Sequence, residues 1–306
     1  MSGHVAQFEN SAQRHEDWTS GPVLHASAAG SFPRASLRRA HALAQSMDRT
    51  LYVLRVMQAA SPTQRAIMAL SMIDDISDLE RFVSTARASL HMCQDVLHDG
   101  FEDELLVIEH GDLFAVASAY ASQLRASLIV VPGDQASGAA VTRLARTTER
   151  PVLVARPHTD HALMIAACES LIPPRPLVSR ALDVAQYFGL SVLAVHNEPP
   201  HRRRTWYERF GQLLRQRPAM ARAATKTDPT NVSTVLTRTR HAAEAILDEA
   251  AAHDADLVVV GTHPRGWPRR VGRVSVARRI VERANNSVLV MPLHARNAPA
   301  DTPREC

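Results

Sequence analysis

The sequence predicts an α/β protein with two domains in tandem, each built on a doubly wound parallel sheet of about five strands. Three observations support this prediction. The chain has 306 residues, about twice the usual size of a single domain. Short runs of leucine and β-branched residues, typical of strands buried on both faces, alternate with segments of helical spacing. The same series of runs occurs twice along the chain.

The predicted strands form four matched pairs. The first copy has VLHA at 23–26, LYVLRV at 51–56, LIVV at 128–131 and PVLV at 151–154; the second has LMIA at 163–166, LSVLAV at 190–195, LVVV at 257–260 and SVLV at 287–290. The offsets between the copies are 140, 139, 129 and 136 residues in that order. Length changes therefore fall between strands, and each copy is expected to form the same fold.

Helices are predicted between these strands. Apolar residues recur at three- and four-residue spacing in 113–124 and again in 242–250. Asp112 is a predicted N-cap, with Gly111 as a turn residue before it. Sheets of this kind bind ligands beyond the carboxyl ends of their strands, where the strand order reverses. Binding residues are therefore expected just after Ala28, Pro132, Cys168 and Gly261.

Composition and cysteine spacing exclude several classes of protein. Hydrophobic residues make up 45% and charged residues 22% of the chain, as in ordinary globular proteins. No apolar run is long enough for a membrane helix, and the first twenty residues lack the apolar stretch of a secretory signal. The three cysteines, Cys93, Cys168 and Cys306, have no metal-binding spacing. We expect a cytoplasmic protein with reduced thiols and no metal.

The segment after LVVV, GTHPRGWPRRVGRVSVARRIVERANNSVLVMP from 261 to 292, carries the most informative pattern. It resembles the signature of the universal stress protein family: a glycine, two residues, a second glycine, nine residues, and a glycine followed by serine or threonine. Gly261 and Ser275 keep the first glycine and the hydroxyl, whereas Pro264 and Val274 replace the other glycines. The resemblance extends from about residue 20 to 294 and implies two tandem Rossmann-like domains.

The resemblance also implies where a nucleotide would bind. In the first copy Gly138 and Ala139 take the final Gly-Ser positions and the loop is seven residues shorter, so enclosure of a triphosphate is not expected there. ATP-binding members carry an aspartate where this chain has Ala28 and Cys168. Any adenine-nucleotide site is therefore expected in the second copy, with weak affinity, and its residues are the following: Gly261, Thr262, Pro264, Arg265, Ser275, Val276, Cys168 and Ala194.

The family resemblance implies a non-catalytic stress-response protein with regulatory or protective action. The alternative is an ATP-dependent enzyme or ATP hydrolase of the related adenine-nucleotide α-hydrolase-like superfamily. The motifs of that class are missing, because the corresponding stretches read SAAGSF and ACESLI, and no catalytic residue is assigned. Trp206, Tyr207 and Phe210 alternate with arginines, a pattern that also fits an amphipathic helix, so nucleic acid is not the expected ligand.

The predicted domain boundaries are 18–157 and 160–295, with polar tails at 1–17 and 296–306. Single-domain relatives usually dimerise through their last strand, and edge strands seek partners. The strands at 152–155 and 287–291 are therefore expected to pair with each other, so that the chain forms a pseudo-dimer of its own two domains. A homo-oligomer and unidentified protein partners are also expected, and a membrane is not.

Overall fold

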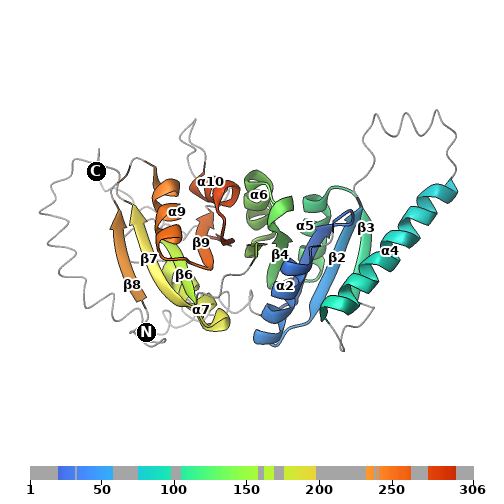
Figure 1. Cartoon of the computed structure of the whole chain (residues 1–306), viewed down its shortest axis with the longest axis horizontal. Helices are drawn as coiled ribbons and strands as arrows, with labels where there is room; N and C mark the ends of the chain where they lie inside the picture. The colour runs from blue at the N-terminus through green and yellow to red at the C-terminus, as the bar shows by residue number, and fades with distance from the viewer. Residues whose placement is uncertain are drawn as a thin grey trace, which may run out of the picture. The chain divides into compact units, whose positions relative to one another are not determined.

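The computed structural model describes residues 20–31, 33–57, 75–97, 105–157, 162–168, 176–197, 232–237, 239, 241–262 and 275–293. The chain divides into two compact units (Figure 1). Unit 1 comprises Met1–Ala136 and Arg150–Pro157, and unit 2 comprises Ser137–Glu149 and His158–Cys306. The predicted boundaries of 18–157 and 160–295 stay a prediction.

Unit 1 contains a parallel sheet with the strand order β3-β2-β1-β4-β5. The order reverses between β1 and β4, which places a crevice at their carboxyl ends. Its elements in chain order are β1 (Val23–Ala28), α2 (Arg34–Ser46), β2 (Leu51–Met57), α4 (Asp75–Leu97), β3 (Leu106–His110), α5 (Leu113–Gln123), β4 (Leu128–Pro132), the 3-10 turn η2 (Gly133–Gln135) and β5 (Val152–Ala155).

Unit 2 repeats this plan with the order β8-β7-β6-β9-β10, again entirely parallel. The reversal lies between β6 and β9. Its elements are α6 (Gly138–Thr148), β6 (Leu163–Cys168), α7 (Pro176–Phe188), β7 (Ser191–Asn197), β8 (Val232–Thr237), α9 (Ala242–Ala252), β9 (Leu257–Thr262), α10 (Val276–Arg283) and β10 (Ser287–Pro292). The predicted fold class is confirmed: each unit has five described strands, all parallel and in a doubly wound order.

Helix α6 belongs to unit 2 although it lies in the first half of the chain. It packs on α10, β9 and β10, and Figure 1 shows the green α6 beside the red α10. The close approach occurs at Gly138, where a Cβ would lie 2.3 Å from the backbone oxygen of Arg278. The glycine that aligns with a phosphate-binding position therefore admits a neighbouring helix.

The strand ladders correct one detail of the predicted repeat. Val23 pairs with Leu51 and Leu163 pairs with Ser191, so the second strands of the two units are offset by 140 residues, not 139. Arg55 consequently occupies the ladder position of Val195. The offset predicted from the sequence was one residue too small, because two runs of similar apolar residues align almost equally well when one is shifted by one position.

Local signals explain several element boundaries. The Asp112 side chain accepts a hydrogen bond from the Ala115 N–H at 2.9 Å, which confirms it as the N-cap of α5. Gly111 has φ +147, a backbone conformation that favours glycine. Among the described helices none has the length and apolar character needed to cross a bilayer.

Candidate functional site

The predicted binding residues of unit 2 gather mainly at one edge of its sheet. Cys168 is the last residue of β6, and Gly261 and Thr262 end β9. Ser275 and Val276 stand at the start of α10, after the segment that follows β9. Ala194 lies in the middle of β7, away from the carboxyl end of the strand; it is buried and pairs with Ala166. Pro264 and Arg265 lie outside the described residues, so the site is described here without them.

Gly261 packs closely against a neighbouring side chain. A Cβ at this position would lie 2.4 Å from Cδ1 of Leu293, which is itself buried. The absence of a side chain therefore lets Leu293 cover the end of β9. This is a structural use of the glycine that the motif assigns to phosphate.

Thr262 and Ser275 present their hydroxyls differently. Thr262 is buried, with Oγ1 3.5 Å from the Met291 carbonyl oxygen, so its hydroxyl faces β10. Ser275 is exposed at the N-cap of α10, and its side chain makes no capping hydrogen bond. Because the first N–H groups of a helix have no partner within the helix, the start of α10 offers donors to an anion. Val276 follows as a partly exposed residue.

At the corresponding position of unit 1, side chains join the loops that follow β1 and β4. Gln135, just after β4, accepts a hydrogen bond from the Ala28 N–H at 2.7 Å and donates another to Ser31 Oγ. Ser31 Oγ in turn donates to the Ala28 carbonyl at 3.1 Å. The amide that ends β1 is therefore already satisfied, and the loop after β1 is tied to the loop after β4.

Arg55 holds the same loop from within the core. It is fully buried on β2 and donates to Ser27 Oγ at 2.6 Å, Ala29 O at 3.0 Å, Ser31 O and, on α4, Ser89 Oγ at 3.3 Å. Burial lowers the pKa of Arg55 to about 10, an effect that nearby Cys93 opposes. The guanidinium therefore stays charged at neutral pH. Sequence reasoning missed Arg55, although a charged residue within the apolar run LYVLRV was the available signal.

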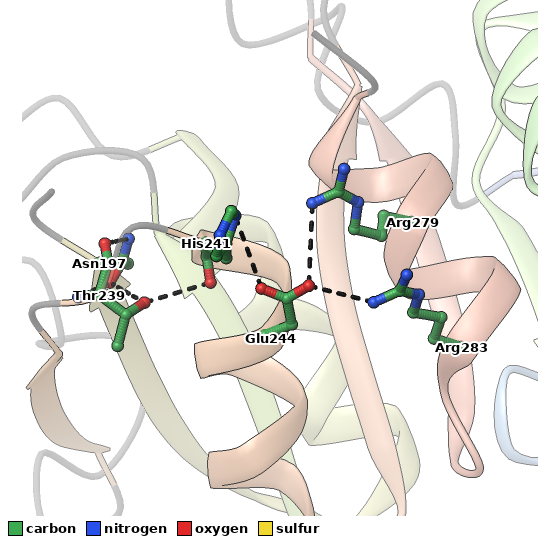
Figure 2. A network of polar contacts seen from close by, with 6 residues as sticks. All are labelled: Asn197, Thr239, His241, Glu244, Arg279 and Arg283. Atoms are coloured by element: carbon green, nitrogen blue, oxygen red, sulfur yellow. Dashed lines mark hydrogen bonds and ion pairs between the residues drawn. The ribbon is translucent and has the colours of Figure 1, made fainter.

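A second polar network lies at the carboxyl end of β7 (Figure 2). Asn197 Oδ1 accepts from the N–H and the hydroxyl of Thr239, at 3.0 and 3.1 Å, and so holds the segment before α9. On α9, Glu244 reaches Arg283 at 3.1 Å and Arg279 at 3.9 Å on α10, and His241 at 3.7 Å. Such exposed ion pairs contribute about 0–1 kcal/mol each. The network joins α9 to α10.

Comparisons with known proteins agree with the sequence interpretation. Residues 172–292 match the model of the universal stress protein family, which confirms the resemblance. No curated protein matches the chain. Within the described residues no group of three or more potential ligands could hold a metal ion.

Solved structures show the same fold over nearly the whole chain. A universal stress protein from Archaeoglobus fulgidus DSM 4304 is 13% identical with a TM-score of 0.60, covering 90% of this chain and 98% of that chain. A candidate universal stress protein from Pseudomonas aeruginosa UCBPP-PA14 is 14% identical with a TM-score of 0.59, covering 90% and 94%. A functionally unknown protein from Pseudomonas aeruginosa PAO1 is 14% identical with a TM-score of 0.56, at the same coverage.

Proposed function

We propose that this chain, whose residues 172–292 match the universal stress protein family, is a non-catalytic stress-response protein with regulatory or protective action. Its adenine-nucleotide binding is weak or absent and is confined to unit 2. The observation that carries the proposal is the contrast between the two crevices. Gln135 satisfies the end of β1 in unit 1, whereas α10 of unit 2 begins with no capping side-chain hydrogen bond.

The same residues account for the expected weakness of binding. Gly261 is packed against Leu293 and Thr262 faces β10, so two of the motif residues are directed to the core. A lost charge-assisted contact costs about 1.5–3 kcal/mol, so two or three losses convert a micromolar site into a millimolar one. Arginine side chains would supply much of the remaining attraction, and exposed charges are screened over about 10 Å at ~0.1 M salt.

Calorimetry of the full chain with ATP, ADP and AMP tests this proposal. We expect millimolar dissociation constants at low salt, several-fold weaker binding near ~0.15 M salt, and a further loss in Ser275→Ala, which removes an exposed hydroxyl at the N-cap of α10. Ser137→Ala is the matched control, because the Ser137 hydroxyl already accepts from the Ala140 N–H of α6. Tight binding that salt does not weaken contradicts the proposal, as does nucleotide turnover abolished by one loop substitution.

The remaining parts of the proposal concern location and assembly. We propose a cytoplasmic location, where the buried Cys93 would stay a thiol. We also propose that Val152–Ala155 pairs with Ser287–Met291 across the two units. The chain is further proposed to bind other proteins, copies of itself included, and neither nucleic acid nor membrane. Cysteines placed in the two strands should form a disulfide on mild oxidation if they pair. Failure of every such pair to cross-link in the folded protein contradicts the pairing.

A further inference from the structure

His25 is a fully buried histidine in the middle of β1. Its Nε2 lies 2.9 Å from Ser36 Oγ on α2, and the Ser36 hydroxyl donates to Pro33 O at 3.0 Å. A serine hydroxyl has only one proton, so Nε2 must be the donor to Ser36 and Nδ1 must carry the lone pair. Nδ1 has no hydrogen-bond partner within the described part of the chain. His25 is therefore held neutral, with no acceptor for a second proton.

The groups around His25 also oppose protonation. Neighbouring β2 contributes the Arg55 cation, and β4, whose Val130 pairs with His25, has no titratable residue. The buried faces of α2 and α4 contribute Ser36, Ser89 and Cys93, and their described charged side chains are exposed or half-exposed. On α5 the titratable side chain is Tyr120, bonded to Glu109. Burial, and next the charge of Arg55, lower the pKa of His25 to about 3.

Unit 2 shows that the fold does not require these polar groups. His25 pairs with Val53 in unit 1, and Ile165 pairs with Leu193 at the same ladder position in unit 2. By the same register, Ala167 and Val195 stand where unit 1 has Ser27 and Arg55. All four of these unit 2 residues are buried and apolar. The buried basic pair is thus a property of unit 1 alone.

We propose that His25 makes unit 1 an acid-responsive element, which opens in mildly acidic surroundings while unit 2 keeps its fold. This inference does not depend on nucleotide binding. Within the described residues nothing could accept a hydrogen bond from a protonated Nδ1, and the Arg55 cation opposes a second charge there. Protonation of His25 should therefore require β1 and α2 to separate.

The direction of the effect follows from proton linkage. Above the ordinary histidine pKa of 6.5 His25 is neutral in both the closed and the open form, and the closed form has its full stability. Below 6.5 the open form takes up a proton and the closed form does not. The opening equilibrium constant should therefore increase about tenfold per pH unit, reaching about 100-fold near pH 4.5.

Hydrogen exchange mass spectrometry of the full chain, with labelling times scaled to the intrinsic exchange rate at each pH, measures this opening. We expect peptides of β1, α2 and β2 to lose protection between pH 6.5 and 4.5 before those of β6, α7 and β7. His25→Ile, which introduces the residue found at the same ladder position in unit 2, should remove this early loss. His25→Gln should do the same, because glutamine has no titratable group. His91→Gln, at an exposed histidine of α4, is the control that should behave as wild type.

Two results would overturn the inference. One is simultaneous loss of protection in both units, with the same pH dependence in wild type and His25→Ile. The other is obtained without any variant: an NMR titration in which the His25 ring of the folded protein takes up its proton near pH 6.5. The inference requires that ring to stay neutral, with the proton on Nε2, while unit 1 is closed.

Discussion

Replacing Arg55 by leucine is expected to destabilise unit 1 by about 2–4 kcal/mol. The substitution removes a buried cation, which alone would be favourable. It also takes the donor from the buried Ser27 hydroxyl and from the half-buried Ala29 and Ser31 carbonyls. Each buried polar group left unpaired costs about 1–3 kcal/mol, and the shorter side chain adds a cavity. The losses therefore exceed the desolvation energy that is recovered.

Urea denaturation monitored by hydrogen exchange, which follows peptides of each unit separately, measures the Arg55→Leu effect. The largest increase in exchange is expected at 28–31, the loop that Arg55 holds. Arg87→Leu, at an exposed arginine of α4, is the matched control and should change stability by less than about 0.5 kcal/mol. Wild-type or greater stability of Arg55→Leu would show that the cation is not needed to hold the loop.

Gly138→Ala is expected to destabilise unit 2 by about 1–3 kcal/mol, the usual cost of overpacking. In an ordinary helix the same change stabilises by about 0.5–1 kcal/mol, because alanine is the better helix former. Here the new Cβ would lie 2.3 Å from the Arg278 backbone oxygen, so α6 and α10 must move apart. The two effects have opposite signs, and the contact with backbone atoms is the larger.

Thermal and urea unfolding of Gly138→Ala give the sign directly. Ala139→Ser, at the next and half-exposed residue of α6, controls for general changes at the start of the helix and should differ little from wild type. A stabilised Gly138→Ala protein would mean that Gly138 is not in close contact with α10, and the assignment of α6 to unit 2 would lose its main support.

Strands buried on both faces could be predicted well from the sequence. LIVV and LVVV are apolar throughout, and they form β4 and β9 with nearly every residue buried. Five strands were predicted for each domain, but residue ranges were predicted for only four of them. The third strand of each unit was the one without a range. β3 is half-buried and β8 has exposed residues, because both are edge strands. Both also include polar residues, which are Glu109 and His110 in β3 and Ser233, Thr234 and Thr237 in β8. Such strands lack the continuous apolar run on which the prediction depended.

The candidate site shows where sequence reasoning stops. Cys168, Gly261 and Thr262 lie at the carboxyl ends of β6 and β9, as their positions after apolar runs predicted. That these residues bind a nucleotide stays a prediction. The motif could not show that Gly261 packs on Leu293 or that Gln135 joins the loops after β1 and β4. These contacts join residues far apart in the chain, and no local pattern encodes them.

Hydrogen exchange of the full chain with and without millimolar ATP, at low salt, tests whether a nucleotide acts on unit 2 and not on unit 1, whose loops after β1 and β4 are joined by Gln135. We expect slower exchange only after β9 and at the start of α10, with no change at 28–31 and 133–135. Slower exchange at 28–31 and 133–135, with the start of α10 unchanged, would contradict this expectation.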